Sequence, residues 1–208
     1  MEFKISNEFL TQIETLISEN KSLELLLLLE DIHFADIAEI MGELDDFGAG
    51  YIFNTLDSEK TAEILLELDE EDREKILRNL TPKEIAEELD ELSTDDAADI
   101  IGELTKDIKD QVISELEDVE HAKDIVDLLR YDEDSAGGLM GKELVQVNEN
   151  WSVLTCVKEM RAQAENVTRV HSIYVVDDEG RLTGRLSLKD LLTTSTRTPI
   201  SEVYIKKV

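Results

Sequence analysis

The chain has 208 residues, of which 41% are hydrophobic, and a formal net charge of −29. Residues 1–134 carry 41 Asp and Glu against 11 Lys and Arg, a net of −30, whereas residues 135–208 carry 9 against 10, a net of +1. So acidic a surface repels a phosphate backbone, which excludes nucleic acid as a partner, and the apolar residues spread through the acidic part exclude a disordered tail. We therefore expect two folded domains of different charge, the first suited to divalent cations or a basic partner.

The first residues lack the basic region and apolar run of a signal peptide. The longest wholly apolar run, residues 25–29, has five residues, whereas a membrane-spanning helix needs about 20. The chain as given is therefore expected to be soluble and cytoplasmic. Cys156 is the only cysteine, which excludes an intramolecular disulfide, and we expect it in a core.

The acidic part contains a repeat of 12 residues. After two or three longer amphipathic helices in residues 7–45, an apolar residue precedes each repeating leucine by three positions, as on one face of a helix. A unit of this length fits a helix of two to three turns plus a turn of two to four residues. The leucines are Leu44, Leu56, Leu68, Leu80, Leu92, Leu104, Leu116 and Leu128.

Helix start signals recur at the same interval. Thr81 precedes Pro82, Ser93 and Thr94 can cap the next helix, and residues 69–72 are all acidic, which suits a helix N-terminus. Residues 38–44 and 98–104 match almost residue for residue. Short helices stacked in this way form a solenoid, which we expect to be a right-handed superhelix.

One acidic cluster stands out, with seven carboxylates within residues 87–99. Its spacing lacks the alternation of an EF-hand, but Mg²⁺ needs only one or two carboxylates and keeps several waters. Solvation of the helical surface explains the same residues. Scattered histidines give no support for zinc, and no nucleophile pairs with a base, so we expect no enzyme.

The near-neutral part has the pattern of an α/β unit in the order β-α-β-β-α. We expect strands at residues 143–147, 171–176 and 181–186, with a turn at 177–180 between the last two. Helices are expected at 153–164 and 188–193, capped by Ser152 and Ser187.

Residues 175–192 in this order resemble a cystathionine-β-synthase-type (CBS) domain. The resemblance implies an adenine-nucleotide site with Ser187 near the phosphate and Asp190 near the ribose, at positions that follow Gly184. Capping by Ser187 and a first-turn acid at Asp190 explain these residues equally well. Residues 198–203 resemble the connector to a second CBS domain.

The acidic repeat, then the segment from Tyr131 to Met140, then a CBS domain, together resemble the N-terminal cytosolic region of the MgtE family of magnesium transporters. Residues 135–140, Ser-Ala-Gly-Gly-Leu-Met, are the specific element, although Gly141 stands where the family commonly has Thr. We expect Gly137 or Gly138 to supply the backbone freedom for a sharp reversal there. The expected domains are 1–131, a hinge at 132–141, the CBS domain at 142–203 and the start of a connector at 204–208.

The resemblance implies Mg²⁺ ligands at Glu63, Asp95 and Asp99 and at the carbonyl of Gly138. It further implies a magnesium-sensing module at the cytoplasmic face of the cell membrane, which gates its own transmembrane domain by compaction and forms homodimers through CBS domains. Two alternatives stay open: a solenoid whose acidic face docks a protein, and a nucleotide-sensing CBS protein.

Overall fold

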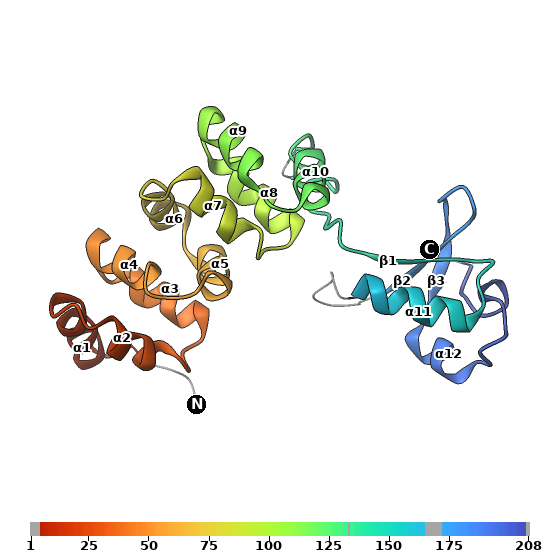
Figure 1. The fold of residues 1–208 in the computed structure, drawn as a ribbon, viewed down its shortest axis with the longest axis horizontal. Helices are drawn as coiled ribbons and strands as arrows, with labels where there is room; N and C mark the ends of the chain where they lie inside the picture. The colour runs from red at the N-terminus through yellow and green to blue at the C-terminus, as the bar shows by residue number, and fades with distance from the viewer. Residues whose placement is uncertain (1–4, 133, 165–171, 207–208) are drawn as a thin grey trace. The chain divides into compact units, whose positions relative to one another are not determined.

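The computed structural model describes residues 5–132, 134–164 and 172–206. The chain divides into two compact units, Met1–Met140 and Gly141–Val208, which we call the helical unit and the α/β unit. Figure 1 shows helices throughout the first and a small sheet with helices in the second, so the predicted fold class is confirmed.

The described part of the helical unit contains ten helices, and the 12-residue repeat sets where most of them begin. From α3 to α9 each helix starts 12 residues after the one before it, and the turns between them have two to four residues, as predicted. The helices are α1 (Asn7–Ser18), α2 (Ser22–Leu29), α3 (Phe34–Gly42), α4 (Asp46–Phe53), α5 (Ser58–Glu67), α6 (Glu70–Leu77), α7 (Pro82–Leu89), α8 (Thr94–Glu103), α9 (Lys106–Glu115) and α10 (Val119–Leu128).

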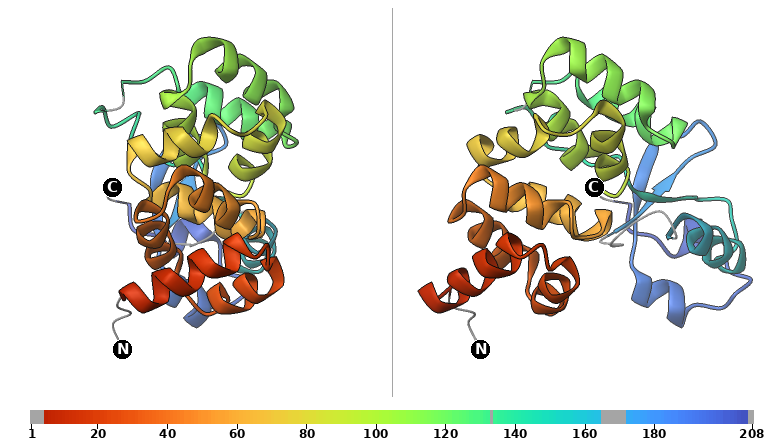
Figure 2. Two further views of the ribbon diagram at one scale, coloured as in Figure 1. Left: turned by 90° about the vertical axis from the view of Figure 1, so that its left-hand side faces the viewer. Right: turned by 60° about the vertical axis from the view of Figure 1, so that its left-hand side comes forward.

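Alternate helices stack on one another. Helices α3, α5, α7 and α9 pack in one row, while α4 packs against α6, and α8 against α10. Figures 1 and 2 show the resulting succession of short helices within this unit. The predicted longer helices at the start are only partly correct, because α1 has 12 residues whereas α2 and α3 have 8 and 9.

The repeating leucine plays a different part from the one its spacing predicts. Most copies lie just past the end of a helix, as Leu92 does after α7, rather than on the helical face. The apolar residue three positions earlier lies inside the helix and is buried, as Leu89 is. The leucine therefore closes each turn over the core while its partner anchors the helix.

Of the three predicted helix start signals, two form cap hydrogen bonds in the structure, at α6 and α7, and the one at α8 does not. Thr81 and Glu84 form a reciprocal capping box on α7, and the Asp69 carboxylate accepts from the backbone of Asp72 at the start of α6. Ser93 occupies the N-cap of α8, but its side chain makes no cap hydrogen bond. Its hydroxyl instead lies 2.8 Å from Asp95 Oδ1 and 2.6 Å from Asp96 Oδ2.

The α/β unit follows the predicted order β-α-β-β-α. Strand β1 pairs in parallel with β2, and β2 pairs antiparallel with β3, giving the sheet order β1-β2-β3. The expected strands are each slightly long, and His171, in the second, lies outside the described residues. The elements are β1 (Val145–Asn148), α11 (Val153–Ala164), β2 (Ile173–Val176), β3 (Leu182–Leu186), α12 (Leu188–Thr193) and the 3₁₀ turn η1 (Ile200–Glu202).

One turn and one buried thiol match their predictions. Gly180 closes the β2–β3 hairpin with φ +75°, a conformation that favours glycine. Cys156 is fully buried in the core of this unit. Burial raises the pKa of its thiol to about 11, so the thiol is protonated and unreactive at neutral pH.

Candidate functional site

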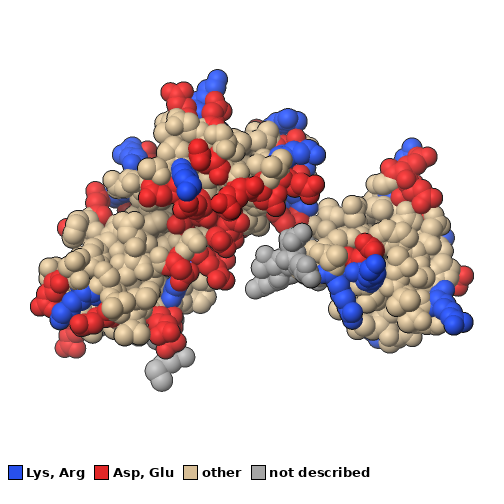
Figure 3. Space-filling model, in the orientation of Figure 1, with Lys and Arg blue, Asp and Glu red and all other residues tan. Residues whose placement is uncertain are grey.

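The acidic side chains gather over the middle helices of the helical unit, where Figure 3 shows a dense group of carboxylates around α5, α7 and α8. Glu63 is exposed on α5. Asp95 lies in the first turn of α8 and Asp99 one turn later, so these two share one face of that helix. A bound divalent cation would lower the repulsion between such neighbours.

The two carboxylates at the start of α8 compete for one proton donor. Ser93 has a single hydroxyl hydrogen, yet its oxygen lies within hydrogen-bond distance of both Asp95 and Asp96. The Ser93 hydroxyl can donate to only one of these carboxylates at a time, so the other can accept from water or bind a cation. This feature is not visible in the sequence, where Ser93 is explained as a helix cap.

A complete metal site is not formed by these residues in the described parts of the chain. Among residues 5–132, 134–164 and 172–206, no three His, Cys, Asp or Glu side chains are grouped so that they could hold a metal ion. Helix α5, with Glu63, packs against α3 and α7, whereas α8, with Asp95 and Asp99, packs against α9 and α10. The set of ligands named from the sequence stays a prediction.

We call the carboxylates around α5, α7 and α8 the acidic face, and Glu88 carries its most strongly shifted carboxyl. It is half-buried on α7, and its Oε2 accepts a hydrogen bond of 2.5 Å from the buried Thr61 hydroxyl on α5. Burial raises the pKa of Glu88 from 4.5 to about 7; the Thr61 bond opposes that rise, while nearby acids, Glu87 first, add to it. The neighbouring helices α5 and α7 are thus joined by a group that titrates near neutrality.

Another polar junction links the end of α7 to the start of α10. Asp90 Oδ2 accepts the backbone N–H of Glu117 at 3.0 Å, while Asp90 Oδ1 is buried without a partner. Buried Nε2 of His121, on the first turn of α10, also lacks one. Such atoms are rare in folded proteins and are usually satisfied by an ordered water.

The segment from Tyr131 to Met140, described except for Glu133, forms turns and belongs to the helical unit. Met140 packs against the helical core, and Gly138 donates its backbone N–H to Ser135 Oγ at 3.1 Å. The predicted reason for its glycines is wrong, because among the described residues only Gly180 is a glycine with positive φ. A Cβ on Gly137 would lie 2.3 Å from Cδ1 of Tyr131, so glycine there allows close approach of a ring.

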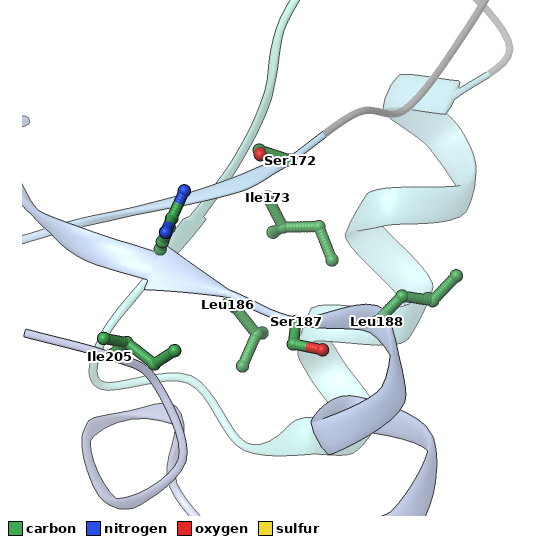
Figure 4. Close-up of a pocket in the computed structure, with 7 residues that line it drawn as sticks. Ser172, Ile173, Leu186, Ser187, Leu188 and Ile205 are labelled. Carbon is green, nitrogen blue, oxygen red and sulfur yellow. The ribbon is translucent and has the colours of Figure 1, made fainter. Parts of the chain in front are cut away.

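The α/β unit has a cleft of about 320 Å³ at the start of β2 and the end of β3. Figure 4 shows the hydroxyls of Ser172 and Ser187 beside an apolar wall that includes Ile173 and Leu188. Arg185 supplies a positive charge to the lining. A cleft with one cation, two hydroxyls and an apolar wall suits a small ligand that has both an anionic and a flat apolar part.

The three residues named from the CBS resemblance have different places. Ser187 lines the cleft, and although it occupies the N-cap of α12, its side chain makes no cap hydrogen bond. Asp190 is not among the residues that line it. At Gly184 a Cβ would lie 2.2 Å from the carbonyl oxygen of Ile205, which pairs with Arg185 beside β3, so this glycine has a packing role.

The fold places this chain in the class of proteins in which a helical-repeat domain is followed by a CBS domain. Residues 32–134 match the family described as MgtE intracellular N domain, and residues 136–196 match the CBS domain. The chain belongs to the MgtE family and corresponds to its N-terminal region, which confirms the resemblance. Within the described residues, no helix combines the length and the apolar character needed to cross a membrane.

Two curated relatives carry the name magnesium transporter MgtE. The protein of Thermus thermophilus is 40% identical over 98 residues, 47% of this chain and 22% of the relative. The protein of Enterococcus faecalis is 33% identical over 89 residues, 43% of this chain and 20% of the relative. The matched region thus spans only about a fifth of each relative's length.

Two solved structures are similar over 96% of this chain. One is the cytosolic domain of the Mg²⁺ channel MgtE in complex with ATP, with a TM-score of 0.85, 33% identity and 81% of that chain covered. The other is the soluble part of a magnesium transporter, with a TM-score of 0.76, 26% identity and 78% covered.

Proposed function

We propose that this chain is the magnesium-sensing cytosolic region of a magnesium transporter, at the cytoplasmic face of the membrane. The observation that carries the proposal is the acidic face of the helical unit, in a chain of the MgtE family whose named relatives are magnesium transporters. Mg²⁺ binds carboxylate oxygens while it keeps part of its water shell, so a face of this kind can take up the ion without a closed cage.

The proposed ligands are Glu63, Asp95, Asp99 and the carbonyl oxygen of Gly138. Mg²⁺ bound there would convert repulsion among carboxylates into attraction and favour a compact state over an open one. Moving such an equilibrium from 1:99 to 99:1 requires about 5.5 kcal/mol of differential binding, which several weakly bound ions can supply together. In the full-length protein, which we propose is a homodimer through its CBS domains, this shift would gate the transmembrane part.

Calorimetric titration with MgCl₂ at constant ionic strength tests the binding step. The wild type should release or absorb heat on binding, and a variant with Asp95→Asn and Asp99→Asn should lose at least one class of site. Asp107→Asn with Asp110→Asn on α9 is the matched control, since it removes the same charge from exposed positions of another helix. An equal loss in both variants would mean that Mg²⁺ only screens the net charge.

A second candidate function is adenine-nucleotide binding in the cleft of the α/β unit. The favouring observation is that Ser187 lines the cleft together with Arg185, and that its side chain does not form a cap hydrogen bond with α12. The similar cytosolic domain of an MgtE channel was solved in complex with ATP. Calorimetric titration with ATP and AMP should show binding, and the substitutions Ser187→Ala and Arg185→Gln should weaken it. If neither nucleotide gives heat of binding, the cleft is not a nucleotide site.

A further inference from the structure

Helix α2 buries one side and leaves the other covered with leucine. Leu25 and Leu29 are fully buried, whereas Leu23 and Leu27 are 78% and 70% exposed and Leu26 is 37% exposed. The spacing of three and four residues places the exposed leucines in one stripe. We call Leu23, Leu26 and Leu27 the α2 leucine face.

A further exposed apolar residue, Phe47, lies on α4, which contacts the start of α2. The hydroxyls of Ser22 and Tyr51 lie 2.7 Å apart, which fixes the start of α2 beside α4. The ring of Tyr51 is 6.3 Å from that of Phe47, which is 70% exposed. Single exposed apolar residues are ordinary, but a set that spans two joined helices marks an interaction surface.

The charges around this surface are mostly acidic, since residues 5–60 hold 13 Asp and Glu against two Lys, and both lysines are engaged. Lys21 pairs with Glu19 at 2.7 Å and with Glu24 at 3.7 Å. Lys60 directs its ammonium to two backbone carbonyls at the end of α2, at 2.7 and 3.0 Å. Figure 3 shows an uncharged area over the first helices of the unit, with acidic side chains and a few basic ones along its margin.

These features decide between two kinds of occupant. A second copy of this chain would bring another net charge of −30 in residues 1–134 against the first, which opposes self-association. A basic amphipathic helix satisfies both features, since its apolar stripe covers the leucines while its cations meet the acidic margin. We propose that the α2 leucine face, with Phe47, docks a basic amphipathic helical segment of a partner protein.

The test uses two fluorescent peptides of about 18 leucine and lysine residues, long enough for a helix to form on binding. One places leucine at helical spacing and the other has the same composition in scrambled order. Their affinity for the chain is measured by anisotropy at about 0.15 M salt, where long-range attraction is largely screened. The amphipathic peptide should bind the wild type about tenfold more tightly than the scrambled one, given the apolar area it buries.

Two variants locate the contact. Leu23→Ser with Leu27→Ser should weaken the amphipathic peptide about tenfold, whereas the control Val119→Ser with Leu139→Ser, at positions 80% and 73% exposed, should not. Equal binding of both peptides, or equal weakening in both variants, would overturn the proposal because charge alone would explain the affinity. A concentration-dependent dimer that is lost in the α2 variant would also overturn it, since the occupant would be a second copy.

Discussion

Substitution of Glu88 by Gln should remove one identifiable part of the pH dependence of stability. In the folded chain the pKa of Glu88 is raised from 4.5 to about 7, chiefly by burial. The folded state therefore holds this proton more tightly than the unfolded state. The resulting stabilisation is fully present below pH 4.5 and is lost as the pH rises through 7.

The size of the effect follows from the same difference. One unit of pKa difference corresponds to about 1.36 kcal/mol, so the full effect is bounded at roughly 3 kcal/mol. Because Glu88 is only half-buried, solvent screening reduces this, and we expect about 1 to 2 kcal/mol. Gln keeps an acceptor for the Thr61 hydroxyl but cannot ionise, so the variant should be more stable than the wild type at pH 8 and similar at pH 5.

Urea unfolding of both proteins at pH 5 and pH 8 measures this difference, and the many other carboxylates cancel in the comparison. Glu67→Gln, at an exposed position of α5 and not among the charges that shift the pKa of Glu88, is the matched control and should change the pH dependence little. If wild type and Glu88→Gln lose the same stability between pH 5 and pH 8, the assigned burial of this carboxyl is wrong.

Three further predictions concern stability and reactivity. Gly184→Ala should cost about 1 to 3 kcal/mol in urea unfolding because its Cβ meets backbone, while Gly102→Ala, with open space around its Cβ on α8, should cost nothing. Thr81→Ala should cost about 0.5 to 2 kcal/mol through loss of the capping box with Glu84, and a loss below this range would show that the box is not formed in solution. Cys156 should resist alkylation at pH 8 in the folded chain and react after addition of urea, and rapid labelling without urea would contradict its burial.

The helix boundaries could be predicted because local signals repeat with the fold. These signals affect the backbone only within a few residues of their own position. Thr81 and Pro82 start α7, and the repeating leucine packs at the turn that follows each helix. A 12-residue interval therefore translates directly into seven helix starts from α3 to α9. The part that the spacing could not decide is whether Leu92 and its counterparts lie within a helix or just after it, since a spacing of three fits both.

The contacts that define the candidate sites could not be predicted, because they join residues far apart in the chain. Thr61 and Glu88 are 27 positions apart, and nothing local marks them as partners. The ring that makes Gly137 necessary is that of Tyr131, six positions earlier, and glycine at a turn suggests backbone freedom before it suggests a close contact.

The central claim, that Mg²⁺ on the acidic face favours a compact state, is tested most directly by small-angle scattering during a titration with MgCl₂. NaCl of matched ionic strength serves as the reference, because salt alone also screens repulsion. The radius of gyration of the wild type should fall at millimolar Mg²⁺ more than in NaCl, and the variant with Asp95→Asn and Asp99→Asn should need more Mg²⁺ or fail to respond. An unchanged radius, or the same response in that variant, would contradict the account.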